Sequence, residues 1–315
     1  MRKVIKFFYL LIVLGIVQAS PASLEAKEIR KPLKVVCTFL PIYSLTLNVV
    51  EGISGIQVEL LLPVHQGCPH NYDLTPGDLL KMARADLIIA NGLGMEEFLD
   101  QFLLKTNNKV PILRAAEKIQ PVSNLPVLSR LGGGKKNRDS GRAQEESLNG
   151  HAWVSPKAAA VMVRTIAEGL ASKAPDQAAG FRANADRYAR KLEDLSGQMS
   201  RLVSLAKNKK VLAFHDDLPY LARDIGLHII GVVEVRPGIE PTTKELARLV
   251  SLIRSKQPAA LFSEPQYSDK VVRTLSRETG IPFFELDPVA AGRAAGDTYE
   301  KAMKKNLDIL RKALR

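Results

Sequence analysis

The chain has 315 residues, of which 46% are hydrophobic and 25% are charged. This composition excludes a disordered or fibrous protein, and the length suits one large globular core or two ordinary ones. The formal net charge of +12 is compatible with binding to nucleic acid or to an anionic surface. The basic residues are scattered along predicted helices, however, so we expect solvated helix faces and no nucleic-acid partner.

The first residues are typical of an export signal. Basic residues precede the apolar run Phe7–Val17, and small residues follow it. The run is shorter than the roughly 20 residues that a membrane-spanning helix needs, so we expect a cleaved signal peptide at 1–22. No cysteine lies near the cleavage region, which argues against a lipid anchor. The mature protein is therefore expected in the periplasm.

The sequence contains two cysteines, Cys37 and Cys68. In an oxidising compartment such a pair can form a disulfide bond. A buried or free thiol, and metal ligation by Cys68, are the alternatives, and the sequence leaves all three open.

Short β-branched runs then alternate with helical stretches, which is the pattern of parallel sheets covered by helices. The first half predicts strands at 34–39, 57–62, 86–90 and 110–113. Thr75 and Pro76 predict a helix start, because threonine caps a helix and proline suits its first turn. Ser155 and Pro156 predict another. The segment Pro121–Gly150 is rich in glycine and basic residues and is predicted to be a mobile surface loop.

A helical stretch without internal proline, 175–207, joins the two halves. Apolar residues recur along it at spacings of four and three, so one face is apolar. We favour a connecting helix packed on both lobes over a coiled-coil seam, because the pattern lasts only about three heptads. The second half predicts strands at 211–214, 229–235, 259–262 and 282–286. The predicted fold is α/β, with parallel-sheet lobes at 28–174 and 208–315.

Histidines and carboxylates follow the predicted strands. His70, His151 and His215 lie in loops after strands, and Glu264 and Asp287 end the last two strands. Ligands of open parallel sheets collect at the carboxyl ends of the strands. Imidazole and carboxylate are ligands that zinc takes in tetrahedral sites. One histidine is a weak signal, but three histidines and a carboxylate from separate segments predict a metal site.

Four motifs carry a family resemblance: Cys68-Pro69-His70-Asn71-Tyr72, Asn149-Gly150-His151-Ala152-Trp153, Phe214-His215-Asp216 and Leu286-Asp287-Pro288. In this order they resemble the zinc- and manganese-binding subunits of ABC importers, the cluster A-I solute-binding proteins. The resemblance implies two α/β lobes bridged by one rigid helix, with one metal ion in the cleft. It places the ligands at His70, His151, His215 and Asp287. Glu264 is then a hydrogen-bond partner that orients a ligand, or an alternative ligand.

The resemblance further implies a monomeric periplasmic binding protein, not an enzyme. It would capture Zn²⁺ as the transported substrate and deliver it to a cognate ABC permease in the inner membrane. Manganese-type members usually carry a carboxylate at the third position, so His215 favours Zn²⁺ over Mn²⁺ or Fe²⁺. A manganese or iron importer subunit is one alternative. A zinc hydrolase is another, but it needs an open coordination position and a general base.

Three features depart from the family pattern or fall outside the ligand set. Many zinc-type members have a His-rich loop before the second motif, whereas Pro121–Gly150 contains no histidine. Metal scavenging by this segment is therefore not expected. His65 is either a partner of the ligands or a solvated residue. His228 is expected to pack within a strand.

Overall fold

The computed structural model describes residues 31–65, 67, 69–106, 109–125, 148–233, 242–266 and 268–315. Contacts divide the chain into Met1–Lys31, which lies almost wholly outside these residues, and one compact unit, Pro32–Arg315. The predicted signal peptide, Cys68 and most of Pro121–Gly150 also fall outside the described residues. Among the residues that are described, no helix is long and apolar enough to cross a membrane.

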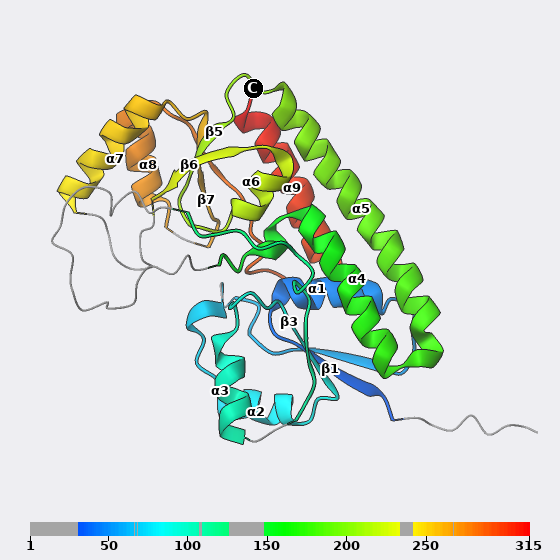
Figure 1. The fold of residues 1–315 in the computed structure, drawn as a ribbon. Coiled ribbons are helices and arrows are strands. Elements are labelled where there is room, and N and C mark those ends of the chain that lie inside the picture. The colour runs from blue at the N-terminus through cyan, green and yellow to red at the C-terminus, as the bar shows by residue number, and fades with distance from the viewer. Residues whose placement is uncertain are drawn as a thin grey trace, which may run out of the picture. The chain divides into compact units, whose positions relative to one another are not determined.

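The first half of the unit forms a parallel sheet with the strand order β2-β1-β3-β4 (Figure 1). Its strands are β1 (Leu33–Cys37), β2 (Ile56–Leu60), β3 (Leu87–Ala90) and β4 (Ile112–Arg114). The helices between them are α1 (Leu40–Val49), α2 (Pro76–Ala83) and α3 (Glu97–Thr106). Cys37 in β1 is a free thiol, and its burial raises its pKa to about 12, so it is unreactive at neutral pH.

The second half repeats this topology, with the parallel strand order β6-β5-β7-β8. Its strands are β5 (Lys210–Ala213), β6 (His228–Val232), β7 (Ala260–Ser263) and β8 (Phe283–Glu285). The helices between them are α6 (Pro219–Ile225), α7 (Thr243–Lys256) and α8 (Lys270–Thr279). In both sheets the strand order reverses beside the first strand, between β1 and β3 and between β5 and β7. Such switch points form ligand crevices at the carboxyl ends of the strands.

Three long helices join the two halves: α4 (Pro156–Lys173), α5 (Ala178–Leu205) and α9 (Thr298–Ala313). The predicted connecting helix is α5, preceded by the 3-10 turn Pro175–Gln177. Its buried face consists of Phe181, Asn184, Ala185, Tyr188, Ala189, Leu192, Leu195, Ser196, Met199 and Val203. Helix α5 packs along α4 and also contacts α1, α6 and α9 (Figure 1). The prediction that this helix packs on both halves is confirmed.

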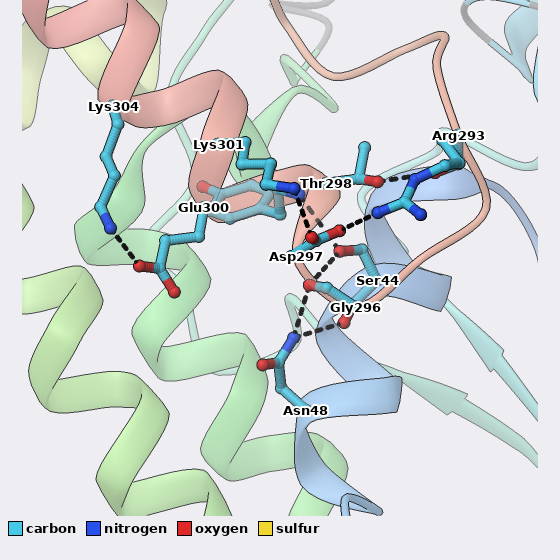
Figure 2. Close-up of polar contacts among 10 residues, drawn as sticks. Ser44, Asn48, Arg293, Gly296, Asp297, Thr298, Glu300, Lys301 and Lys304 are labelled. Carbon is cyan, nitrogen blue, oxygen red and sulfur yellow. Dashed lines mark hydrogen bonds and ion pairs between the residues drawn. The ribbon is translucent and has the colours of Figure 1, made fainter.

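Helix α9 provides a second connection, which the sequence did not predict (Figure 2). Ser44 Oγ and Asn48 Nδ2 in α1 both donate to the carbonyl oxygen of Gly296, at 2.9 Å and 2.8 Å. The Tyr299 N–H donates in turn to Ser44 Oγ at 3.2 Å. The N-terminus of α9, from the second half, is therefore anchored to the first helix of the first half.

One hydrophobic cluster runs through both halves, and a smaller cluster lies between the second sheet and helices α7 and α8. The residues of β5 and the position after it alternate between the two clusters, as successive side chains of a strand must. Val211 and Ala213 belong to the larger cluster, and Leu212 and Phe214 belong to the smaller one. The two sheets therefore share one main core.

Candidate metal centre

His70 lies in the 3-10 turn Pro69–Asn71, between β2 and α2, and is exposed. The start of α2 fixes the chain just beyond it. Thr75 Oγ1 accepts the N–H of Asp78 at 3.2 Å, and the Asp78 carboxylate accepts the N–H of Thr75 at 2.9 Å. This reciprocal cap satisfies backbone donors that the helix leaves unpaired. Tyr72 Oη donates to the same carboxylate at 2.8 Å, so the turn that carries His70 is anchored to the helix.

His151 immediately precedes the 3-10 turn Ala152–Val154, which leads into α4. The next aromatic residue, Trp153, is fully buried and is held from the second half of the chain. Its Nε1–H donates to the carbonyl oxygen of Pro288 at 2.7 Å. The hydroxyl of Tyr299 donates to the carbonyl oxygen of Trp153 at 2.6 Å. The His151 turn is thereby attached to the loop that carries Asp287.

His215 and Glu264 occupy the crevice of the second sheet. His215 follows β5 and Glu264 follows β7, so the two residues leave adjacent strands at their carboxyl ends. His215 is half-buried and Glu264 is buried. Their position matches the ligand crevice of an open parallel sheet.

The equivalent crevice of the first sheet is filled by the chain itself. The buried carboxylate of Glu96 accepts hydrogen bonds from Thr38 Oγ1 at 2.8 Å, from Asn91 N–H at 2.7 Å and from Gly92 N–H at 3.0 Å. Thr38 follows β1, and Asn91 and Gly92 follow β3. The Glu96 carboxylate thus joins the segments that follow β1 and β3.

The three predicted histidines are close enough to influence one another. The rings of His70 and His151 lie with their centroids 5.4 Å apart. Burial, together with the nearby charges of His70 and His215, lowers the pKa of His151 to about 3. Burial lowers the pKa of His215 to about 4. Both imidazoles are therefore neutral at pH 7, and neutral imidazole is the form that binds metal ions.

Three carboxylates form a second group. Burial raises the pKa of Glu264 well above its usual range, and the charges of Asp217 and Asp287 raise it further. Burial also raises the pKa of Asp217 to about 7 and the pKa of Asp287. Glu264 accepts a hydrogen bond from Gln266 Nε2, and Asp287 Oδ1 accepts the N–H of Val289 at 2.7 Å. A dication nearby would favour the ionised forms of these buried carboxyl groups.

Among the described residues, no three His, Cys, Asp or Glu side chains converge closely enough to hold a metal ion.

Comparison with known proteins identifies the family. Residues 35–313 match the family model of ZnuA, described as zinc-uptake complex component A, periplasmic. The chain belongs to this family. Zinc-binding protein AdcA of Streptococcus pyogenes serotype M1 is 28% identical over 299 residues, which cover 91% of this chain and 57% of AdcA. The zinc uptake protein ZnuA of Haemophilus ducreyi is 28% identical over 274 residues, covering 82% of this chain and 85% of that protein.

Solved structures show the same fold. Zn(II)-bound AdcA from Streptococcus pneumoniae has a TM-score of 0.72 and 27% identity, covering 90% of this chain and 58% of AdcA. The solute-binding protein FpvC of Pseudomonas aeruginosa in complex with Mn²⁺ has a TM-score of 0.75 and 26% identity, covering 90% of this chain and 98% of FpvC. The chain thus spans little more than half of the AdcA relatives. The predicted fold of two parallel-sheet lobes with a long connecting helix is confirmed.

In this ZnuA-family chain, the structure brings His70, His151 and His215 into one group and Glu264 and Asp287 into another. Their roles as metal ligands stay predictions. His65 is exposed and carries no described role.

His228 differs from its expectation. It begins β6, as predicted, but its side chain is exposed and does not pack in the strand. The first residue of an edge strand can point into solvent, because β6 has a partner on one side only.

Sequence reasoning missed Asp217 and Asn149. Asp217 is buried, and its Oδ2 atom has no hydrogen-bond partner among the described residues. The signal was present in the two consecutive aspartates after a strand. Asn149 stands two positions before His151 and was noted as part of a motif, but its contacts depend on residues far away in sequence.

Proposed function

We propose that this chain captures a divalent transition metal, Zn²⁺, in the periplasm and delivers it to the permease of an ABC importer in the inner membrane. The observation that carries the proposal is the group of three imidazoles, two of them held neutral by burial, beside a group of buried carboxylates. Membership of a periplasmic zinc-uptake family supports it.

The metal ligands in this proposal are His70, His151, His215 and Asp287. Three nitrogen donors and one oxygen donor suit tetrahedral zinc. Asp287 Oδ1 is engaged by the N–H of Val289, which orients the carboxylate. Glu264, buried and hydrogen-bonded to Gln266, stands beside Asp287 as a hydrogen-bond partner of the ligand set or as an alternative ligand.

Zinc is favoured over manganese because imidazole is a softer donor than carboxylate. The names of the relatives AdcA and ZnuA, which describe zinc binding and zinc uptake, support this assignment. Manganese is the second candidate, because the cluster of carboxylates supplies the oxygen donors that it prefers. The structure of FpvC has been solved in complex with Mn²⁺. In both cases the protein acts as a binding protein and not as an enzyme.

The proposal includes the organisation of the chain. Residues 1–22 form a signal peptide that is removed on export, residues 28–174 and 208–315 form two lobes, and residues 175–207 form the connecting helix. The protein works as a monomer, without a nucleic-acid partner. N-terminal sequencing of the exported protein tests the cleavage, and an N-terminus at Met1 would contradict it.

Metal analysis of protein purified without a chelator and without an affinity tag tests the main proposal. We expect about one zinc ion per chain. Dialysis against equimolar Zn²⁺ and Mn²⁺ should then yield protein loaded mainly with zinc. Protein that retains neither metal, or that hydrolyses ester, peptide or phosphate substrates when loaded with zinc, would contradict the proposal.

A further inference from the structure

Asn149 is almost fully buried, with 1% of its surface exposed, and all of its polar groups have partners. Its Nδ2 group donates to Asp216 O at 2.7 Å and to Asn124 Oδ1 at 3.0 Å. Its Oδ1 accepts the backbone N–H of His151 at 2.9 Å. Its own carbonyl oxygen accepts the hydroxyl of Tyr220 at 2.7 Å. Through one side chain, Asn149 contacts both the His151 turn and the segment that follows β5.

These contacts determine which way the amide faces. A backbone carbonyl can only accept a hydrogen bond, so the group that faces Asp216 O must be the NH₂ group of Asn149. The oxygen Oδ1 therefore faces His151, where it lies 3.2 Å from Nδ1 of the ring. Because an amide oxygen can only accept, Nδ1 of His151 carries the proton. The lone pair of the neutral ring is then on Nε2, the nitrogen that can bind a metal ion.

The same amide also restrains the second half of the candidate site. Asp216 follows His215 directly, and its carbonyl oxygen is held by Asn149 Nδ2. One side chain therefore sets the tautomer of one proposed ligand and fixes the backbone next to another. The two ligands come from segments 64 residues apart in sequence, so no local interaction could relate them.

We infer that Asn149 is the positioning residue of the metal site: it fixes His151 as the Nδ1–H tautomer and holds the His151 turn in register with the His215 segment. This inference rests on the proposed function, since it presumes that both histidines bind metal. Groups that donate or accept at the second nitrogen of a ligating histidine typically change metal affinity about 10- to 100-fold.

The test compares Asn149→Ala and Asn149→Asp with a matched control, Asn184→Ala. Asn184 is also a buried asparagine, and it joins α5 to the first half through hydrogen bonds to Val49 O at 3.0 Å and Glu51 O at 2.8 Å. The nitrogen-15 chemical shifts of the His151 ring report its tautomer in the metal-free protein, with a His151→Gln variant to assign the signals. Competition with a fluorescent chelator gives the zinc affinity.

We expect the Nδ1–H tautomer at His151 in the unchanged chain and in the Asn184→Ala variant. Asn149→Ala should give a mixture of tautomers and a zinc affinity about 10- to 100-fold lower. Asn149→Asp keeps an acceptor for His151 but sets a carboxylate oxygen against Asp216 O. It should therefore retain the tautomer, bind zinc more tightly than the alanine variant and unfold at a lower temperature than the unchanged chain.

An Nε2–H tautomer at His151 in the unchanged chain would overturn the inference. So would an Asn149→Ala variant whose tautomer and zinc affinity change no more than those of Asn184→Ala. If Asn149→Ala does not fold, an Asn149→Asp variant that loses the Nδ1–H tautomer, although it keeps the acceptor for His151, would overturn the inference as well. Because the tautomer is read without metal, a chain that shows the Nδ1–H tautomer under Asn149 control but binds no zinc would refute the proposed function alone.

Discussion

Replacement of His215 by alanine is the most direct test of the second half of the candidate site. His228 provides the control, because it begins β6 whereas His215 follows β5, so the two histidines lie at opposite ends of the second sheet. Lys210 pairs with His228, and His215 lies five residues beyond Lys210. At about 3.3 Å per residue, the three steps from Lys210 to Ala213 place His228 roughly 10 Å from the carboxyl end of β5, beyond which His215 lies. His228 is exposed, so its replacement by alanine should change the stability of the fold little.

The size of the expected effect follows from the number of ligands. The free energy of zinc binding at structural sites is about 10–16 kcal/mol. If four ligands share this free energy evenly, the loss of one costs about 2.5–4 kcal/mol, or roughly 10²- to 10³-fold in affinity. Water entering the vacated position would reduce the loss, so His215→Ala should lie near the lower limit. His228→Ala should leave the affinity unchanged.

Zinc affinity is measured by competition with a fluorescent chelator at constant pH and ionic strength, and far-ultraviolet circular dichroism checks that both variants fold. Equal dissociation constants for His215→Ala and His228→Ala would refute the assignment of His215. Glu264 would then be the next residue to test, because it leaves the adjacent strand at the same edge.

Four further results are expected. His215→Glu should lower the zinc-to-manganese ratio in dialysis against both metals, because an oxygen donor replaces a softer nitrogen; an unchanged ratio would argue against a role in selectivity. Zinc at 100 times its dissociation constant should stabilise the folded chain by about 2.7 kcal/mol and raise its melting temperature by roughly 5 °C, whereas an unchanged calorimetric midpoint would argue against a native site. Small-angle scattering should give nearly equal radii of gyration with and without zinc, because α5 and the contact of Ser44 with Gly296 join the halves at two places. A contraction of several ångströms on zinc binding would contradict this expectation. Trp153→Phe leaves the carbonyl oxygen of Pro288 without its hydrogen-bond donor. It should lower the free energy of unfolding, measured in urea, by about 1–3 kcal/mol, with some further loss from the smaller ring. A change below about 0.5 kcal/mol would show that this contact does not hold the halves together.

The sequence by itself determined the elements whose signals are local. The cap of α2 depends on Thr75 and Asp78, three residues apart, and both hydrogen bonds of the cap are present. Ser155 caps α4 with a single hydrogen bond, its side chain accepting the N–H of Ala158. The periodic apolar face of α5 and the β-branched strands were likewise evident, because burial imposes the period of the element on its own residues. The family motifs added the candidate ligands.

Only the tertiary structure decided how these elements combine. The contact of α9 with α1 joins Ser44 to Gly296, 252 residues apart. No periodicity in either segment predicts this contact. The Glu96 carboxylate accepts hydrogen bonds from Thr38 and Asn91, which follow two different strands. The exposure of His228 depends on its edge position rather than on its type.

Asn149 shows the physical reason most clearly. Its sequence neighbours predict a polar loop residue before a helix, because asparagine commonly satisfies nearby backbone groups. The folding of both halves brings Asn149 beside Asp216. The amide of Asn149 then donates to the carbonyl oxygen of Asp216, and this hydrogen bond fixes its orientation. The identity of the imidazoles could be taken from the sequence, but the nitrogen that each presents is set by a partner that only the fold supplies.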